Sequence, residues 1–267
     1  MNTRRDITIS LLIGVAAGLM SGLMGVGGGI VMIPLMTAFL GLTQHKAHGT
    51  SLAVIVFTAI AGALTYGFTG HTDLLIALEL IAGSMIGARI GALAMNRIPA
   101  RELRMIFAIF IFFIGLRLLL ALPSGEAIVQ TGTVTGVLTI VVIGLITGIL
   151  SGMLGVGGGI VMVPAMVLLL GLAQQDAQGV SLLVMIPTSI VGATTHLKRG
   201  NVVTRIVPWI AVTSIVAAVI GSSLAIGPLK DVLRQIFAVY LLFTSVQMMF
   251  TAWRKKPQAK TAQPGKA

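Results

Sequence analysis

Ten apolar segments alternate along the chain with short polar or Gly- and Pro-rich interruptions. They cover residues 7–25, 28–42, 48–68, 74–96, 103–122, 131–155, 158–172, 178–197, 203–226 and 232–252. Apolar runs of this kind predict membrane-spanning α-helices, because a helix needs about 20 residues to cross a hydrocarbon core of roughly 30 Å. The segments at 28–42 and 158–172 have only 15 residues each and would reach about 22 Å. The pattern therefore predicts an all-α polytopic membrane protein with two helices too short to cross.

The sequence contains an internal duplication, in which the second copy lies 130 residues after the first. GLMSGLMGVGGGIVMIPLM in the first copy aligns with GILSGMLGVGGGIVMVPAM in the second, and about twenty of the 35 positions from 18 to 52 are identical. An internal duplication of this kind indicates two structurally equivalent halves. We place the first repeat at 1–125, the second at 126–252 and a basic cytoplasmic tail at 253–267.

The distribution of Lys and Arg predicts the orientation, because short cytoplasmic loops are rich in these residues. If the first two segments together return the chain to the side on which it began, 14 of the 18 basic residues fall in the cytoplasm. Each half then makes an odd number of crossings. This predicts an inverted-topology repeat with both termini cytoplasmic, an architecture of secondary transporters that work by alternating access. The sequence leaves open whether the short segments span fully, although their length favours a broken or re-entrant form.

Composition narrows the function classes. The chain is 56% hydrophobic and 9% charged, with a mean hydropathy of +1.04, far from the usage of soluble domains. The basic residues behind the net charge of +11 are distributed as expected for cytoplasmic loops of a membrane protein, so we expect no nucleic-acid partner. The chain has no Cys, and its four His and seven acidic residues are scattered, so we expect no metal or other cofactor. No nucleophile with a base, and no carboxylate pair, occurs at matched depth, which argues against an intramembrane enzyme.

Three consecutive glycines lie inside each copy of the repeated motif. They are Gly27, Gly28 and Gly29, and Gly157, Gly158 and Gly159. Glycine costs about 1 kcal/mol relative to alanine inside a helix and tolerates positive φ, so each helix is predicted to stop and restart there. A restarted helix would offer free N–H groups and the positive end of its dipole to an anion, and Ser21 and Ser151 would add hydroxyl donors.

Close helix packing is the alternative explanation of the glycines, since Gly22, Gly25 and Gly29 have the spacing of small residues at helix interfaces. The duplication, the short segments that follow and the matched Pro34 and Pro164 favour the other interpretation. In that interpretation two broken helices face one anion site near the midplane, as in other inverted repeats.

A second repeated element, AHGTSL in the first half and AQGVSL in the second, opens the segments at 48–68 and 178–197. Thr50, Ser51 and Ser181 in this element have two interpretations. Their position favours N-terminal helix caps. If the preceding turn enters the membrane, the same hydroxyls become donors to a substrate.

Two charged residues lie inside predicted spans, where charged residues are candidates for function. Arg89 is seven residues from the cytoplasmic end of its segment, and either snorkelling or a counter-charge for an anion accounts for it equally well. Glu79 is the acidic residue deep enough to carry a coupling proton, although a position at the interface fits it better. Neither has a counterpart in the second half, where Trp209 and Val219 occupy the matching positions.

These motifs resemble a known family. Two copies of G-x-x-S-G-x-x-G-V-G-G-G-I-V-x-x-P, each followed by A-x-G-[TV]-S-L, are similar to the sulfite exporter TauE/SafE family over nearly the whole chain. The resemblance implies a transporter of sulfite or organosulfonates such as sulfoacetate in the bacterial inner membrane. It also implies that the site includes the motif glycines, Gly25 and Gly155 among them, and the second element, from which this chain departs at Val180.

The expected partners are a small anionic substrate and the lipid bilayer, and the sequence is compatible with a homo-oligomer. Two rival functions share the same topology and polarity. One is a passive anion channel, and the other is a transporter of a different small anion. The direction of transport and the coupling ion stay open.

Overall fold

The computed structural model describes residues 3–94, 131–155, 157–227 and 230–254, with scattered positions between 105 and 129. Within these residues every regular element is an α-helix. The helices are α1 (Thr3–Met24), α2 (Gly29–Phe39), α3 (Gln44–Phe68), α4 (Leu74–Ala94), α6 (Val134–Leu154), α7 (Gly159–Leu169), α8 (Gln174–Lys198), α9 (Val207–Ile226) and α10 (Lys230–Arg254). By length and composition, α1, α3, α4, α6, α8 and α9 can each cross a membrane. The predicted all-α polytopic membrane protein is confirmed.

The observed helices follow the predicted segments closely. The short helices α2 and α7 have 11 residues each, so each is about 16 Å long and cannot cross the hydrocarbon core. The helices α3 and α8 begin four residues earlier than predicted, at Gln44 and Gln174, because their first turns are polar and hydropathy does not register them. The predicted segment at 103–122, apart from scattered positions, and most of the tail at 253–267 lie outside the described residues.

Two pairs of long helices pack closely along glycine faces. On α1, a Cβ at Gly14, Gly18 or Gly22 would overlap backbone carbonyl oxygens of α9. The glycines of α6 at the equivalent positions meet the backbone of α4 in the same way. Small residues let membrane helices approach one another at this distance. The packing interpretation therefore holds for Gly22, at the end of this face.

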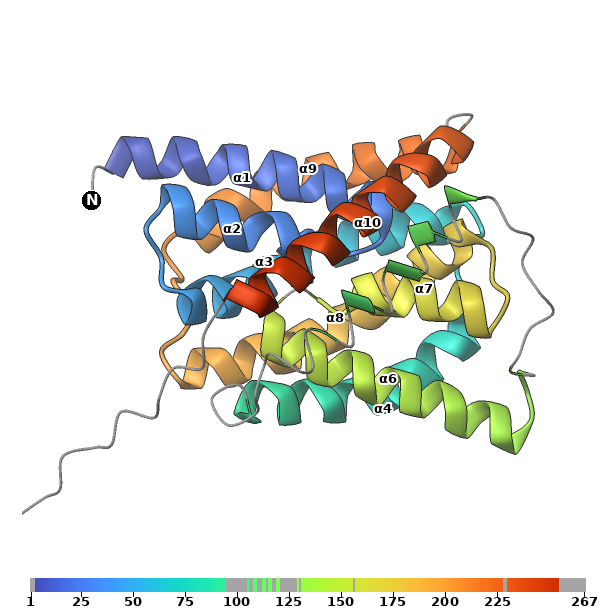
Figure 1. Ribbon diagram of the computed structural model, residues 1–267. Coiled ribbons are helices and arrows are strands. Elements are labelled where there is room, and N and C mark those ends of the chain that lie inside the picture. Colours follow the sequence, from blue (N-terminus) through green and yellow to red (C-terminus); the bar gives the residue numbers. More distant parts are fainter. Residues whose placement is uncertain are drawn as a thin grey trace, which may run out of the picture.

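The two short helices begin inside the bundle. Each contributes buried residues to an apolar cluster, Met32 and Met36 of α2 to one and Met162 and Met166 of α7 to the other. Figure 1 shows α1 with α9 along one edge of the molecule and α4 with α6 along the opposite edge, with α2 and α7 between these pairs. The starts of the short helices are thereby enclosed by protein, where backbone groups without helical partners are tolerated.

Candidate functional site

Each glycine motif breaks its helix as predicted. The first break lies between Met24, where α1 ends, and Gly29, where α2 begins. Gly28 is the N-cap of α2 with φ of 72°, and Gly158 is the N-cap of α7 with φ of 82°. Positive φ strains any residue with a Cβ. Because both N-caps are glycines, neither side chain caps the helix, and the first N–H groups of α2 and α7 have no partner within their helices.

The two breaks meet at the same pair of side chains, which come from α3 and α8. A Cβ on Gly27 would lie 2.8 Å from Met185 Sδ and 3.2 Å from Ile55 Cγ2. A Cβ on Gly157, in the other half, would lie 3.0 Å from Met185 Sδ and 3.2 Å from Ile55 Cδ1. A Cβ on Gly159 would overlap Met185 Cε. Segments 130 positions apart in sequence therefore converge on one place, where Ile55 and Met185 are fully buried.

A buried hydroxyl without a partner accompanies each break. Ser21 and Ser151 are 0% and 1% exposed, and within the described residues neither Oγ has a hydrogen-bond partner. The Cβ of Ser151 lies 3.3 Å from the position that a Cβ on Gly158 would occupy, so this side chain adjoins the start of α7. Buried polar groups are normally hydrogen-bonded. A ligand at the breaks would satisfy this pair.

Ser51 and Ser181, the serines of the second repeated element, each bind backbone at the helix break of the other half. Ser51 Oγ lies 2.6 Å from the carbonyl oxygen of Gly155 and 2.8 Å from that of His48, and its one proton serves both. Ser181 Oγ donates to the carbonyl oxygen of Gly25 at 3.0 Å. The bonds to Gly155 and Gly25 join one half to the other, and each satisfies a carbonyl that the helix break leaves open. Their hydroxyls therefore bind backbone in this structure.

The expectation that the second element caps its own helix is wrong. The N-caps of α3 and α8 are Thr43 and Ala173, so Thr50 is the seventh residue of its helix, and Ser51 and Ser181 are each the eighth. Thr50 Oγ1 accepts a hydrogen bond from the Val203 N–H at 2.9 Å and thereby holds the connection before α9. Val180, at the matching position, cannot form such a bond.

Three polar residues that the sequence did not indicate hold the ends of α1 and α6. The Tyr66 hydroxyl lies 3.0 Å from the Gly22 carbonyl oxygen and 2.9 Å from Gln178 Oε1, and its one proton serves both. Gln178 Nε2 donates to the carbonyl of the next residue of α1, Leu23, at 3.1 Å. In the other half His196 Nε2 lies 3.0 Å from the carbonyl oxygen of Gly152, so this nitrogen carries the proton. The 130-residue offset aligns Tyr66 with His196. A polar residue at the same position of both halves was the signal in the sequence that could have indicated this role.

Removing the Tyr66 hydroxyl is expected to destabilise the protein. Tyr66→Phe leaves the oxygens of Gly22 and Gln178 without their donor, which should lower the free energy of unfolding by about 1–2 kcal/mol. Thr65→Val is the control, because that hydroxyl bonds only to Ala61 in its own helix. Thermal unfolding of both variants in one detergent tests this. Equal midpoints would show that the Tyr66 bond contributes nothing.

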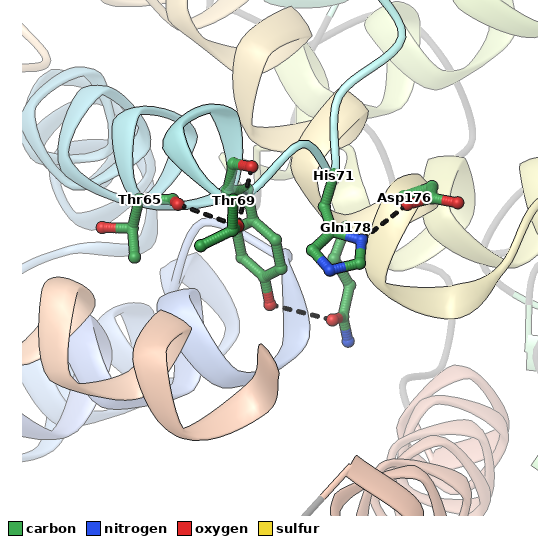
Figure 2. A network of polar contacts seen from close by, with 6 residues as sticks. Thr65, Thr69, His71, Asp176 and Gln178 are labelled. Atoms are coloured by element: carbon green, nitrogen blue, oxygen red, sulfur yellow. Dashed lines mark hydrogen bonds and ion pairs between the residues drawn. The ribbon is translucent and has the colours of Figure 1, made fainter. Parts of the chain in front are cut away.

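The same end of the molecule carries a side-chain hydrogen bond between the halves. His71 Nδ1, in the connection after α3, lies 2.8 Å from Asp176 Oδ1 in the first turn of α8. Figure 2 shows this pair beside Gln178, with Thr65 and Thr69 on the neighbouring helix. The α3–α4 connection and the start of α8 are therefore joined beside the Tyr66 contact.

Arg89 is not one of the residues gathered at the two helix breaks. Its side chain is exposed on α4, whereas Gly83, Gly87 and Gly91 form the face that packs against α6. Glu79 is half-buried, and its Oε2 lacks a hydrogen-bond partner within the described residues. The position of Arg89 favours snorkelling over a counter-charge at the site.

Arg89→Gln is therefore expected to transport substrate like the unaltered protein, even at low substrate concentration. Arg199→Gln is the matched comparison, because Arg199 Nη1 donates to the carbonyl of Ala92 at 3.2 Å and so joins α8 to α4. This second variant should lower the unfolding midpoint. Uptake into proteoliposomes and thermal unfolding measure the two effects. A large loss of uptake in Arg89→Gln would restore the counter-charge interpretation.

Comparison with known proteins identifies the family. A sequence model of the sulfite exporter TauE/SafE family matches residues 2–118 and 140–267. The chain belongs to this family. It is 32% identical over 219 residues to a probable membrane transporter protein, YunE, of Bacillus subtilis (strain 168), covering 74% of this chain and 80% of the relative. It is 25% identical over 259 residues to a probable membrane transporter protein of Xylella fastidiosa (strain 9a5c), covering 94% and 98%.

The resemblance carried by the two motifs is thereby confirmed. The TauE/SafE chain is a multi-pass membrane transporter and not an enzyme. Sulfite is named in the description of the family. The two relatives are described only as probable membrane transporters. No solved structure gives a significant match.

Proposed function

We propose that this transporter carries a small sulfur-containing anion, sulfite or an organosulfonate such as sulfoacetate, through a site between its two halves. The observation that carries the proposal is the convergence of the two glycine breaks on Met185 and Ile55. The family description supports the sulfur chemistry. The anion binds where the starts of α2 and α7 approach each other.

The proposed ligands are backbone N–H groups of both breaks and the hydroxyls of Ser21 and Ser151. One helix dipole contributes about 0.3–1 kcal/mol, or up to ~2 kcal/mol when partly buried, which is far less than the cost of stripping water from an anion. Several donors must therefore converge, and glycines allow an oxyanion to approach the main chain closely. Thr50, Ser51 and Ser181 support this site by holding backbone, and Arg89 lies outside it.

The closed centre favours a carrier over a passive channel. Ile55 and Met185 occupy the space between the two breaks and are 0% exposed. An anion can enter only if these side chains and their helices move, as alternating access requires. Met is unbranched and flexible, so Met185 is the side chain that makes way.

Met185→Ala is expected to widen the centre and to relax selection by size. Binding of a larger sulfonate should improve relative to sulfite by several-fold, since the Met185 side chain no longer competes for the space. Val184→Ala is the control, because Val184 is also fully buried but is not among the nearest neighbours of Gly27 or Gly157, whereas Met185 is the nearest neighbour of both. Competition binding with sulfite and a larger sulfonate measures the ratio. An unchanged ratio in Met185→Ala would remove Met185 from the site.

The inverted repeat is part of the same proposal. The breaks and the serine bonds recur at an offset of 130 residues, as do the glycine faces. In Figure 1, α1 begins at the left and α6 at the right, and each packs against the fourth helix of the other half. These features support repeats at 1–125 and 126–252 of opposite orientation. The count of basic residues supports cytoplasmic termini in the bacterial inner membrane.

A thermal-shift panel on detergent-purified protein tests the substrate. The panel contains sulfite, sulfate, thiosulfate, sulfoacetate and taurine, with acetate as a carboxylate control. A ligand that binds only the folded protein raises the midpoint of thermal unfolding. At a ligand concentration of 100 Kd the free energy of unfolding increases by about 2.7 kcal/mol. We expect a shift with sulfite or sulfoacetate and none with acetate. A shift with acetate alone would point to a different small anion.

A further inference from the structure

A titratable side chain is buried where α8 contacts the end of α6. His196 is 0% exposed, and its Nε2 donates to the carbonyl oxygen of Gly152 at 3.0 Å. The other ring nitrogen, Nδ1, is also buried and has no hydrogen-bond partner within the described residues. Because Nε2 carries the proton of the neutral ring, Nδ1 presents an open lone pair. The His196 ring therefore has one position at which a further proton can bind.

The bond to Gly152 does not by itself require a histidine. The 130-residue offset aligns Tyr66 with His196 and Gly22 with Gly152, and the Tyr66 hydroxyl makes the equivalent contact with the Gly22 carbonyl oxygen at 3.0 Å. Tyrosine as a residue type stays neutral near pH 7, whereas histidine changes charge between about pH 5 and pH 8. One half thus makes this contact with a type of side chain that can take up a proton near neutral pH, and the other half does not.

The charged neighbours of His196 are positive. Arg199, and His45 of α3 when it is protonated, repel a positive charge on the ring. The helix α6 contains no charged residue. The other charged or histidine residues on α3, α4 and α8 are Lys46, His48, Glu79, Arg89, Asp176 and Lys198.

Both carboxylates of these helices lie far from the ring. Asp176 is in the first turn of α8, at the opposite end from His196, and is bound to His71. Arg199 joins this end of α8 to the carbonyl of Ala92 on α4, and Glu79 lies 13 residues before Ala92, about 20 Å along the helix. A buried imidazolium needs a negative partner, and within the described parts of α3, α4, α6 and α8 no carboxylate is placed to be that partner.

The proposed anion site adjoins this contact. Gly152, whose carbonyl binds His196, directly follows Ser151, whose buried hydroxyl is unpartnered within the described residues. The Ser151 side chain in turn adjoins Gly158 at the start of α7. An anion held by Ser151 and the start of α7 would therefore supply the negative charge that a protonated His196 lacks.

We propose that His196 binds a proton together with the transported anion and so couples transport to protons. The ring accepts one proton from water at Nδ1 and keeps the proton on Nε2, so the bond to Gly152 is retained while the ring gains a positive charge. This charge favours the anion beside Ser151, and the bound anion favours the proton to the same extent. Water reaches this end of α8, because Lys198, two residues on, is exposed. The proposal rests on the proposed anion site.

Titration calorimetry in buffers with different heats of ionisation counts the protons that bind with the anion. Sulfoacetate and sulfite are the probes, and the titration of sulfite itself is measured separately and subtracted. The unaltered protein should take up as much as about one proton per anion, and its affinity should fall as the pH rises from about 6 to about 8. Anion binding without proton uptake would overturn this proposal alone. Absence of binding by every anion of the thermal-shift panel would overturn the proposed function as well.

Two variants assign the proton to His196. H196Y introduces the residue of the first half, and H196Q is smaller; both keep a donor for the Gly152 carbonyl but gain no charge near neutral pH. Each should bind the anion without proton uptake, at least about fivefold more weakly than the unaltered protein at about pH 6, with the difference vanishing toward pH 8. The matched control is H71Q, which removes a histidine at the other end of α8 and should keep the uptake. Uptake that persists in H196Y and H196Q, or that is lost equally in H71Q, would overturn the assignment.

Discussion

Gly28→Ala is expected to abolish substrate binding and to lower the stability of the protein severely. Gly28 has φ of 72°, a conformation that costs a residue with a Cβ about 1–2 kcal/mol. The added Cβ would also overlap the carbonyl oxygen of Ala17 in the backbone of α1. Backbone cannot rotate away as a side chain can, so α1 and the start of α2 must separate. Thermal unfolding and the ligand-induced shift with sulfite or sulfoacetate measure both effects.

Gly41→Ala is the matched control for this prediction. Gly41 has φ of 64° and no heavy atom within 4 Å of its added Cβ, so only the conformational cost applies. Gly158→Ala should fall between the two, since its Cβ would lie 3.1 Å from the carbonyl oxygen of Thr147. Equal losses in Gly28→Ala and Gly41→Ala would show that the contact with α1 is unimportant. Normal binding by a folded Gly28→Ala variant would remove this break from the site.

Replacing Ser21 and Ser151 together by alanine is expected to weaken substrate binding by at least a hundredfold. A hydrogen bond to a charged group contributes about 1.5–3 kcal/mol, and 1.4 kcal/mol corresponds to a factor of ten. Stability should change little, because within the described residues the two hydroxyls have no protein partner to lose. Titration calorimetry with the best anion of the panel, together with thermal unfolding, separates these effects.

Ser214→Ala is the control for the serine pair. Ser214 is also 0% exposed, but its hydroxyl donates to the Ala211 carbonyl at 2.9 Å in its own helix. This variant should bind substrate normally. If the double variant S21A/S151A binds the anion as tightly as Ser214→Ala does, the two unpartnered hydroxyls are not ligands. The backbone alone would then have to hold the anion.

Local properties of the residues predicted much of the fold. Hydropathy located the spans because each needs a continuous apolar run, and it identified α2 and α7 as too short. The glycines of each motif predicted a helix break, because positive φ at Gly28 and Gly158 is a property of the residue itself. The first turns of α3 and α8 were missed, since their polar residues carry no hydropathy signal. The N-cap interpretation of Ser51 and Ser181 was wrong for the same reason.

The sequence by itself determined a duplicated, membrane-spanning chain with two broken helices, and its motifs pointed to the TauE/SafE family. Only the tertiary structure decided that Gly27 and Gly157 meet at Ile55 and Met185, because that contact joins residues more than a hundred positions apart. The same holds for the bond from Ser51 to Gly155 and for the exposure of Arg89. Which side of a helix faces protein depends on the neighbours that pack against it, and one sequence does not specify those neighbours.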